Sequence, residues 1–293
     1  MTGRLSPASL ATLLMLVAAG TSALQNLVIR LAGDSGVHSF QIAFLRSFFG
    51  FVVISAIVLA VARRVPGTGA MRQIGASSLF HFVSMLTGFH GITLMPLAES
   101  SALTFAGPLF GTLAAAAFLG EKVRLRRWLA ILAGFAGVVI VLRPGAVSVG
   151  LGPALVLLST LAGAGMAVMI KRMSATETTM ALVFHQSLLM AVLTLPPALA
   201  VWTTPAPAIL AWLAAMGVLS ALGWLAFARA FALADASALL PIEFVRLPLV
   251  AALGFLAFGE VPDLWVWIGA AVIFAASLSL AHRESAAARL PGK

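Results

Sequence analysis

The sequence of 293 residues contains no cysteine and no tyrosine, and only 9% of its residues are charged. Without cysteine there can be no disulfide, no thiolate metal site and no cysteine nucleophile. Soluble domains carry roughly 25% charged residues, so the composition excludes a chain surrounded by water. Because 61% of the residues are hydrophobic, we expect an all-α integral membrane protein in contact with a lipid bilayer.

Ten apolar runs are long enough to cross a bilayer core of about 30 Å as helices of about 20 residues. Clusters of glycine, proline and charged residues separate several of them, for example at residues 33–36 and 63–67. We expect the first run to be a span rather than a cleaved signal peptide, because cleavage would leave an odd number of spans. The predicted transmembrane helices are 8–31, 39–62, 73–95, 98–119, 126–142, 150–172, 178–202, 208–232, 236–258 and 263–282.

The chain contains an internal repeat. Residues 97–103 (Leu-Ala-Glu-Ser-Ser-Ala-Leu) return almost unchanged as residues 233–239 (Leu-Ala-Asp-Ala-Ser-Ala-Leu). Each copy leads into an apolar stretch that ends in Gly-Glu, at residues 120–121 and 259–260. Two related halves in a membrane chain are typical of transporters, because alternating access is readily built from two copies of one bundle.

The basic residues give the orientation, since cytoplasmic segments of membrane proteins are enriched in lysine and arginine. With the N-terminus inside, the inner segments hold thirteen basic residues and the outer loops only Arg30 and Arg143. The net charge of +9 therefore reflects membrane topology and predicts no nucleic-acid partner. Both termini are then cytoplasmic, and five spans per half make the second half inverted relative to the first. The predicted units are a first repeat at 1–146, a second, inverted repeat at 147–283 and a cytoplasmic tail at 284–293.

An ordered set of residues occurs once in each half. The first half has Arg46, residues 97–103, Pro108, Gly120-Glu121 and Trp128, and the second half has Gln186, Pro248, Gly259-Glu260 and Trp267. These sets resemble the EamA-type drug/metabolite transporter superfamily, most closely its branch that exports amino acids, including aromatic ones. The resemblance implies ten helices forming a basket in the inner membrane around a central cavity. Spans 1, 3, 4, 6, 8 and 9 would line this cavity, with spans 5 and 10 at the periphery.

Two prolines interrupt corresponding spans of the two halves. Pro108 and Pro248 each remove a backbone hydrogen bond, which a membrane tolerates only where protein or a wet cavity covers the freed carbonyl. Matched interruptions indicate a transport site, although simple packing kinks are the alternative. Thr104 and Phe105 precede the first break and Glu243 precedes the second, so we predict that these three residues line the cavity.

Glu243 and Arg246 are three residues apart and so share one helix face. Either they form an ion pair that satisfies only itself, or the face opens on the cavity. In the second case Arg246 would bind a carboxylate and Glu243 an amine, which together suit a zwitterionic amino acid.

Several other polar or aromatic residues lie within predicted spans. Arg46, with Gln186 at its place in the second half, is predicted to be structural or gating, like the two prolines; substrate contact is the alternative. His81 is either a proton-linked group or a donor to a neighbouring helix. Trp224 either stacks on a substrate or faces lipid and core. The remaining predicted cavity residues are Gln25 and Met85.

These observations favour a secondary exporter of small metabolites, most of all amino acids, that works by alternating access. The alternative is a multidrug exporter of lipophilic cations. Span 1 carries no acid where small multidrug members of the superfamily carry their coupling glutamate, so facilitated diffusion is expected rather than proton coupling. Glu99 and Asp235 are interpreted as helix-start carboxylates. No His-Glu-x-x-His motif or paired intramembrane aspartate occurs, so no enzymatic activity, cofactor or metal is predicted.

Overall fold

The computed structural model describes residues 6–119, 125–143, 150–173, 176–233, 239 and 242–288. Within these ranges the regular secondary structure is α-helical, as the apolar runs predict. Gly120-Glu121 and Asp235 lie outside the described residues. The helices are α1 (Pro7–Asp34), α2 (Ser39–Ala62), α3 (Met71–Thr93), α4 (Leu97–Thr104), α5 (Gly107–Leu119), α6 (Leu125–Leu142), α7 (Leu151–Met173), α8 (Thr179–Ala200), α9 (Pro207–Leu233), α11 (Arg246–Phe258) and α12 (Leu264–Ala288).

Local chemistry sets the helix ends near their predicted positions. Ser6 caps α1 by accepting a hydrogen bond from the N–H of Ser9, and Pro7 occupies the first helical turn. After α1, Gly36 adopts a φ of +84°, which its missing Cβ permits. The last helix differs from the prediction, because α12 continues to Ala288 rather than ending at residue 282.

Five helices are long and apolar enough to cross a membrane by length and composition: Ser9–Asp34, Ser39–Val61, Leu151–Ile170, Thr179–Ala200 and Pro207–Phe227. Shorter apolar helices are Trp128–Leu142, Arg246–Phe258 and Leu264–Ser279. The predicted span at 98–119 is divided into α4 and α5. The chain is therefore a multi-pass helical protein, while the number of ten spans stays a prediction.

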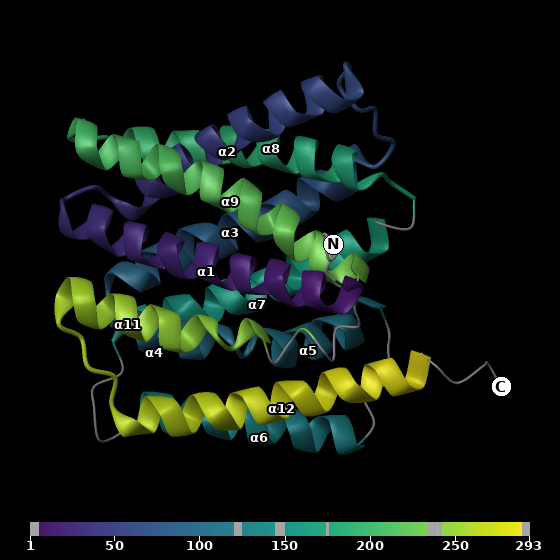
Figure 1. The fold of residues 1–293 in the computed structure, drawn as a ribbon, viewed down its shortest axis with the longest axis vertical. Helices are drawn as coiled ribbons and strands as arrows, with labels where there is room; N and C mark the ends of the chain where they lie inside the picture. Colours follow the sequence, from purple (N-terminus) through teal and green to yellow (C-terminus); the bar gives the residue numbers. More distant parts are fainter. Residues whose placement is uncertain are drawn as a thin grey trace, which may run out of the picture.

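The helices run side by side along one direction of the bundle (Figure 1). The most extensive packing joins α1 to α9, α2 to α8, α3 to α7 and α6 to α12. Each of these pairs takes one helix from before residue 143 and one from after residue 150. The α6–α12 pair lies at one edge of the bundle and α2 and α8 at the opposite edge, so the pairs build a continuous structure in which neither half stands alone (Figure 1).

A close backbone contact holds the α6–α12 pair together. A Cβ atom added to Gly137 would lie 2.9 Å from the carbonyl oxygen of Gly269, and one added to Gly269 would lie 2.7 Å from that of Gly137. Only glycine fits at both positions without moving a helix. This pair contributes none of the described residues that line the cavity presented below, which agrees with the peripheral place expected for spans 5 and 10.

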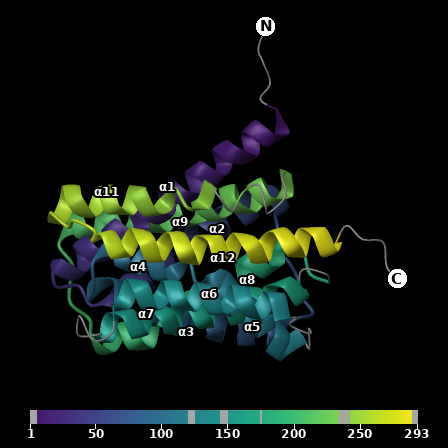
Figure 2. The ribbon, with the colours of Figure 1, turned by 90° about the horizontal axis from the view of Figure 1, so that it is seen from below.

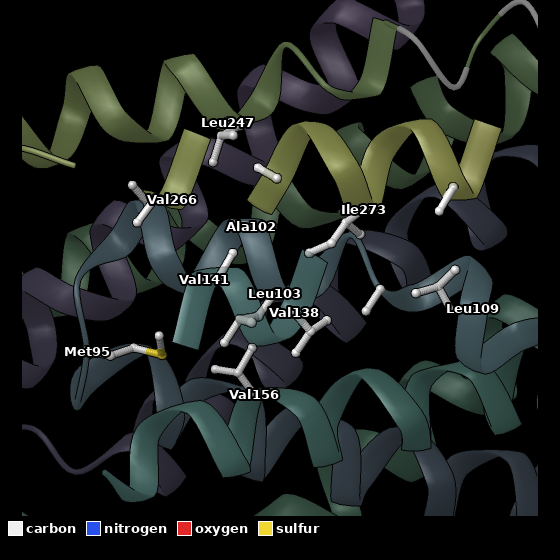
Figure 3. Packing of buried hydrophobic residues seen from close by; sticks show 14 of the residues in the cluster. Met95, Ala102, Leu103, Leu109, Val138, Val141, Val156, Leu247, Val266 and Ile273 are labelled. Atoms are coloured by element: carbon white, nitrogen blue, oxygen red, sulfur yellow. The ribbon is translucent and has the colours of Figure 1, made fainter. Parts of the chain in front are cut away.

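A large cluster of buried apolar side chains lies between this edge and the rest of the bundle (Figure 3). It joins Leu103 of α4 to Val138 of α6, Val156 of α7, Leu247 of α11 and Ile273 of α12. Between helices in a bilayer such side chains stabilise by close van der Waals packing, because lipid tails are as apolar as the side chains themselves. The cluster fixes α4 and α11, the two helices next to the proline breaks, against a rigid support.

Candidate substrate cavity

A cavity of about 480 Å³ lies in the middle of the bundle. Its walls come from α1, α2, α3, α7, α8 and α9, together with Glu243 and Arg246. The resemblance implied a lining by spans 1, 3, 4, 6, 8 and 9, so it did not include α2 and α8, which correspond to spans 2 and 7. The described part of α4, in span 4, reaches only an adjoining hollow. The volume lies within the range of about 300–1,000 Å³ that is typical of small-molecule sites.

Most residues predicted for the site lie on this cavity. The lining includes Gln25, Arg46, His81, Met85, Gln186, Trp224, Glu243 and Arg246. Two predicted residues are placed elsewhere. Thr104 lines the adjoining hollow, and Phe105 packs against the buried cluster beside Phe244, with ring centroids 4.9 Å apart.

Arg46 reaches from α2 to three neighbouring helices. Its Nε donates to Oε1 of Gln25 on α1 at 3.1 Å, and one terminal nitrogen donates to Oγ of Ser220 on α9 at 2.6 Å. The other terminal nitrogen has only a weak contact of 3.9 Å with the Met85 sulfur, and the guanidinium lies 5.7 Å from the centroid of the Phe89 ring. Among the described residues, no carboxylate forms a salt bridge with Arg46. The side chain therefore both ties helices together and presents a positive charge to the cavity.

Arg246 joins the two halves at the proline breaks. One terminal nitrogen donates to Oγ1 of Thr104 at 2.8 Å, and the other lies 3.8 Å from Oε1 of Glu243. Its guanidinium also lies 4.8 Å from the centroid of the Phe105 ring. The distance to Glu243 is long for a charge-assisted hydrogen bond, so the pair leaves the carboxylate able to accept a donor from the cavity. The same geometry therefore allows both an ion pair between Glu243 and Arg246 and a carboxylate that lines the cavity.

The helix breaks fall four residues before each proline. α4 ends at Thr104, and the N–H of Phe105 bonds three residues back to Ala102 at 3.2 Å. In the second half, the N–H of Val245 bonds three residues back to Ile242 at 3.1 Å, just after Phe244. Proline causes this because its ring clashes with the carbonyl four residues earlier and it has no N–H to donate.

The carbonyl freed beside the first break is paired. Phe105 O accepts a hydrogen bond from Oγ of Ser277 on α12 at 3.2 Å. Pro108 and Pro248 themselves are exposed, so they shape the backbone without contacting the cavity contents. Together with the Arg246–Thr104 hydrogen bond, the breaks bring flexible backbone from both halves to one place beside the cavity.

Three polar groups on the cavity wall are buried without a partner among the described residues: Nδ1 of His81, Nε2 of Gln186 and Nε of Arg246. Buried polar groups usually have a hydrogen-bond partner, so these three nitrogens have unused hydrogen-bonding capacity. Within the described ranges, Nδ1 of His81 does not donate to a neighbouring helix, which was the alternative role predicted for this side chain.

The remaining wall is apolar and adaptable. Trp224 stacks on Phe227, with ring centroids 5.9 Å apart and planes inclined by 10°. Four methionines line the cavity, and their flexible thioether side chains adjust to ligands of different shape. They are Met15, Met85, Met166 and Met190.

Polar contacts join several elements at one end of the bundle, which we call the Glu260 end. Here α3 passes into α4 and α11 into α12, at the left of Figure 1. One terminal nitrogen of Arg30 donates to the carbonyl oxygens of Ile92, Thr93 and Met95 at 3.0–3.3 Å. Oε2 of Glu260 accepts from the N–H of Leu97 at 2.8 Å and so caps α4. The link between α3 and α4 is thereby held from two other elements.

A second contact at the Glu260 end joins α2 to the link between α8 and α9. Gln41, which is fully buried, donates through Nε2 to Thr203 O at 2.6 Å and accepts from Thr203 N at 3.2 Å. On α7 the lining residues Met166 and Ile170 fall in the helix half farther from the Glu260 end, whereas on α1 and α3 the lining reaches Ile29 and Phe89, in the halves nearer to it. The opposite end, where α1 begins and α12 finishes, is called the terminal end (Figure 2).

Sequence reasoning missed three features of this region. Ser220 and Asn26 on the cavity wall gave no signal, because single small polar residues in a span are common. Glu260 was identified only as part of the repeated Gly-Glu pair, and its helix-capping role depends on a partner 163 residues away. Glu99 lies in the first turn of α4, as predicted. Within the described ranges, no group of three or more His, Asp or Glu side chains is placed to hold a metal ion.

Two repeats of apolar helices, paired across the halves around a cavity with charged and aromatic walls, define a multi-pass membrane transporter of small molecules. Residues 9–143 and 150–281 each match the EamA-like transporter family. The chain belongs to this family, so the predicted resemblance is confirmed at the level of the family and of its two repeats.

Relatives of stated activity transport different solutes. The chain is 28% identical over 251 residues to an S-adenosylmethionine uptake transporter of Rickettsia bellii, covering 86% of each protein. It is 36% identical over 180 residues to a riboflavin transporter of Vibrio cholerae, covering 61% of this chain and 60% of the relative. A pseudopaline exporter of Pseudomonas aeruginosa is 30% identical over 280 residues, with 93% and 96% covered. A solved crystal structure with 20% identity matches at a TM-score of 0.59 over 94% of this chain and 98% of that one, which shows the fold alone.

Proposed function

We propose that the chain is a secondary transporter that exports small zwitterionic metabolites, with amino acids, including aromatic ones, as the substrate class. The observation that carries this proposal is the presence of both charge signs on one cavity wall. Glu243 is available to an ammonium group, while Arg46 and Arg246 are available to a carboxylate. The stacked Trp224 and Phe227 offer a surface for a flat or apolar side chain.

The relatives support this chemistry without fixing the solute. S-Adenosylmethionine, named for the Rickettsia relative, is itself an amino acid that carries a flat ring system. Riboflavin, named for the Vibrio relative, is also built around a flat ring system. Because these relatives include both uptake and export proteins, the export direction is our proposal and rests on the resemblance of the repeated sequence motifs to the amino-acid exporter branch.

For the architecture we propose ten spans in two inverted repeats, at 1–146 and 147–283, in the inner membrane with both termini in the cytoplasm. The packing supports this, because α2 on α8 and α6 on α12 pair equivalent spans of the two halves, and a twofold axis that relates the halves would exchange the α1–α9 pair with the α3–α7 pair. The excess of basic residues in the predicted inner segments supports the orientation. The terminal end is then cytoplasmic.

For the mechanism we propose alternating access by bending at the two proline breaks. Arg246 connects these breaks through Thr104, so its contacts change when either half moves. Arg46 and Gln186 serve as gating or structural groups, because Arg46 joins three helices that would separate during opening. Substitution of both Pro108 and Pro248 by alanine is expected to slow transport by about tenfold by stiffening the breaks. An unchanged rate would contradict this mechanism while leaving the transport function intact.

The experiment that tests the function is transport by the purified chain in proteoliposomes. We expect uptake of radiolabelled L-phenylalanine that unlabelled zwitterionic amino acids inhibit, and whose rate is the same with and without a pH gradient. Glu243→Gln is expected to reduce the rate at least tenfold, whereas Glu177→Gln, at an exposed contact outside the cavity, should not. If riboflavin moves and no amino acid does, the substrate class is wrong.

A multidrug exporter of lipophilic cations is the second candidate. The stacked Trp224 and Phe227 beside a carboxylate favour it, because aromatic faces and acids attract organic cations. The two arginines on the same cavity count against it. Inhibition of phenylalanine transport by ethidium, but not by zwitterionic amino acids, would favour the second candidate.

A further inference from the structure

A smaller hollow of about 170 Å³ adjoins the main cavity. Arg46, His81, Met85 and Phe89 line both spaces, so these four side chains form the boundary between them. The walls beyond this boundary come from α3, α4 and α7. We call this hollow the side chamber. A cavity of about 150 Å³ can hold a benzene-sized molecule, so the side chamber has room for a carboxylate and the carbon atoms next to it.

Most hydroxyl groups in the side chamber are already paired. Ser84 Oγ donates to Ser159 O at 2.8 Å, and Ser159 Oγ donates to Ser84 O at 2.7 Å. Thr104 Oγ1 donates to Ser101 O at 2.7 Å and accepts from Arg246. These contacts hold α3 against α7 and the end of α4 against Arg246, so they leave little capacity for a ligand.

Ser100 differs from these hydroxyl groups. It lies on α4, only 1% of its surface is exposed, and its Oγ has no hydrogen-bond partner among the described residues. A serine inside a helix commonly bonds to the carbonyl three or four residues back, as Thr104 does. Ser100 does not, and it lines the side chamber together with His81, whose Nδ1 is also unpaired in the described part of the chain.

The unpaired groups have one chemical preference in common. The serine hydroxyl donates hydrogen bonds, Nδ1 of His81 does so in the tautomer that carries its proton, and Arg46 presents a terminal nitrogen whose described contact is the weak one to the Met85 sulfur. No described carboxylate lines the side chamber. Three donors, one of them cationic, around a space without an acidic group are complementary to an anionic oxygen group.

We propose that the side chamber is the subsite for the carboxylate of the transported molecule. Arg46 supplies the charge, Ser100 and His81 donate hydrogen bonds, and the remainder of the molecule stays in the main cavity against Trp224 and Phe227. The proposal rests on the proposed function, which it deepens by requiring a free carboxylate. It also makes Ser100, the residue that follows Glu99 in the repeated segment, a specificity-determining residue.

Binding of a matched pair of probes to the full chain in detergent micelles tests the proposal. The probes are 4-fluorobenzoate and 4-fluorobenzamide, which have nearly the same shape and differ in charge, and ¹⁹F line broadening gives their dissociation constants. We expect the benzoate to bind at least about tenfold more tightly than the benzamide. Ser100→Ala should weaken the benzoate about tenfold, as expected for a lost hydrogen bond to a charged group, and leave the benzamide unchanged.

Ser78→Ala is the matched control. Ser78 lies on α3, is fully buried, and has an Oγ without a partner in the described ranges, but it lines neither space. It should leave both dissociation constants unchanged. His81→Gln is a second variant that acts on the side chamber from another helix and should also weaken the benzoate selectively. Melting temperatures of all variants establish that each is folded.

Three results would overturn the proposal: equal binding of the two probes, as expected if the side chamber holds only water; no saturable binding of the benzoate; or equal effects of the Ser100 and Ser78 substitutions. The proposed function fails separately. If proteoliposomes move no amino acid but benzoate binding depends on Ser100, the function is wrong and the subsite stands. If phenylalanine transport is intact in Ser100→Ala and benzoate binding is unaffected, the subsite is wrong and the function stands.

Discussion

The two ends of the bundle are held together by different kinds of contact. At the Glu260 end, Arg30, Gln41 and Glu260 bond to backbone groups of neighbouring elements, and Gln41 is fully buried. At the terminal end, the contact of Glu177 with the N–H of Gly69 is exposed to solvent. Buried polar contacts are costly to leave unpaired, whereas exposed ones exchange easily with water. The comparison predicts that the Glu260 end is the harder one to open and that a few separable polar contacts keep it closed, each of which can be tested.

The largest expected effect is one-sided access to the cavity. Because the chain has no cysteine, an introduced thiol is its only one. In oriented membrane vesicles, Ser187→Cys on the cavity wall should react with an impermeant maleimide at least about tenfold faster from the terminal end. Val261→Cys, exposed at the Glu260 end, should react from the opposite side. Equal reaction of Ser187→Cys from both sides would contradict the closed state of the Glu260 end.

Removal of the α4 cap should have the next largest effect. Glu260→Ala deletes the acceptor for the N–H of Leu97, and loss of such a cap costs about 1–2 kcal/mol. In the Ser187→Cys background we expect about a tenfold increase in labelling from the Glu260 end. Glu260→Gln, which keeps an acceptor oxygen, should give a smaller increase, and Glu177→Ala at the terminal end should give none. No increase in Glu260→Ala would show that the cap does not keep this end shut.

Loss of the Gln41 contact should have a moderate effect. Gln41→Ala removes the hydrogen bonds to both backbone groups of Thr203, each worth about 1 kcal/mol net. Since Thr203 is exposed, water replaces part of what is lost. We expect roughly a fivefold increase in the same labelling assay. A larger effect than that of Glu260→Ala would reverse the order of the two contacts.

The exposed ion pair at the Glu260 end should matter least. Arg143 donates to Oδ2 of Asp263 at 2.7 Å, but both side chains are partly exposed, and such pairs contribute little. The N–H of Trp265 and, to a smaller degree, Arg143 lower the pKa of Asp263, which precedes α12. A carboxyl with a lowered pKa stabilises the folded state at pH values above its ordinary pKa, and this stabilisation is lost as the pH falls through the lowered value.

Melting temperatures of Asp263→Asn check this expectation. The difference from the unsubstituted chain should be small and the same at pH 7 and pH 5.5, and it should shrink only below about pH 4, near the ordinary pKa of aspartate. A difference that changes between pH 7 and pH 5.5 would contradict the role given to Asp263.

The sequence predicted the helices well because apolar length and Gly/Pro clusters act locally. The breaks near Pro108 and Pro248 were also predictable, since proline alters the backbone of its own helix. The contact between these breaks was not, because the Arg246–Thr104 hydrogen bond joins residues 142 positions apart. Phe105 shows the same limit: its nearness to the break suggested the cavity, but its side chain packs against the buried cluster, which is formed by residues distant in the sequence.

The hydrogen bond from Leu97 to Glu260 has a consequence for how this chain can change over generations. It joins the first residue of the repeated segment in one half to the Gly-Glu pair of the other half. A substitution of Glu260 in one copy therefore removes the acceptor of a backbone N–H in the other copy, so the two halves are not free to vary independently at this contact.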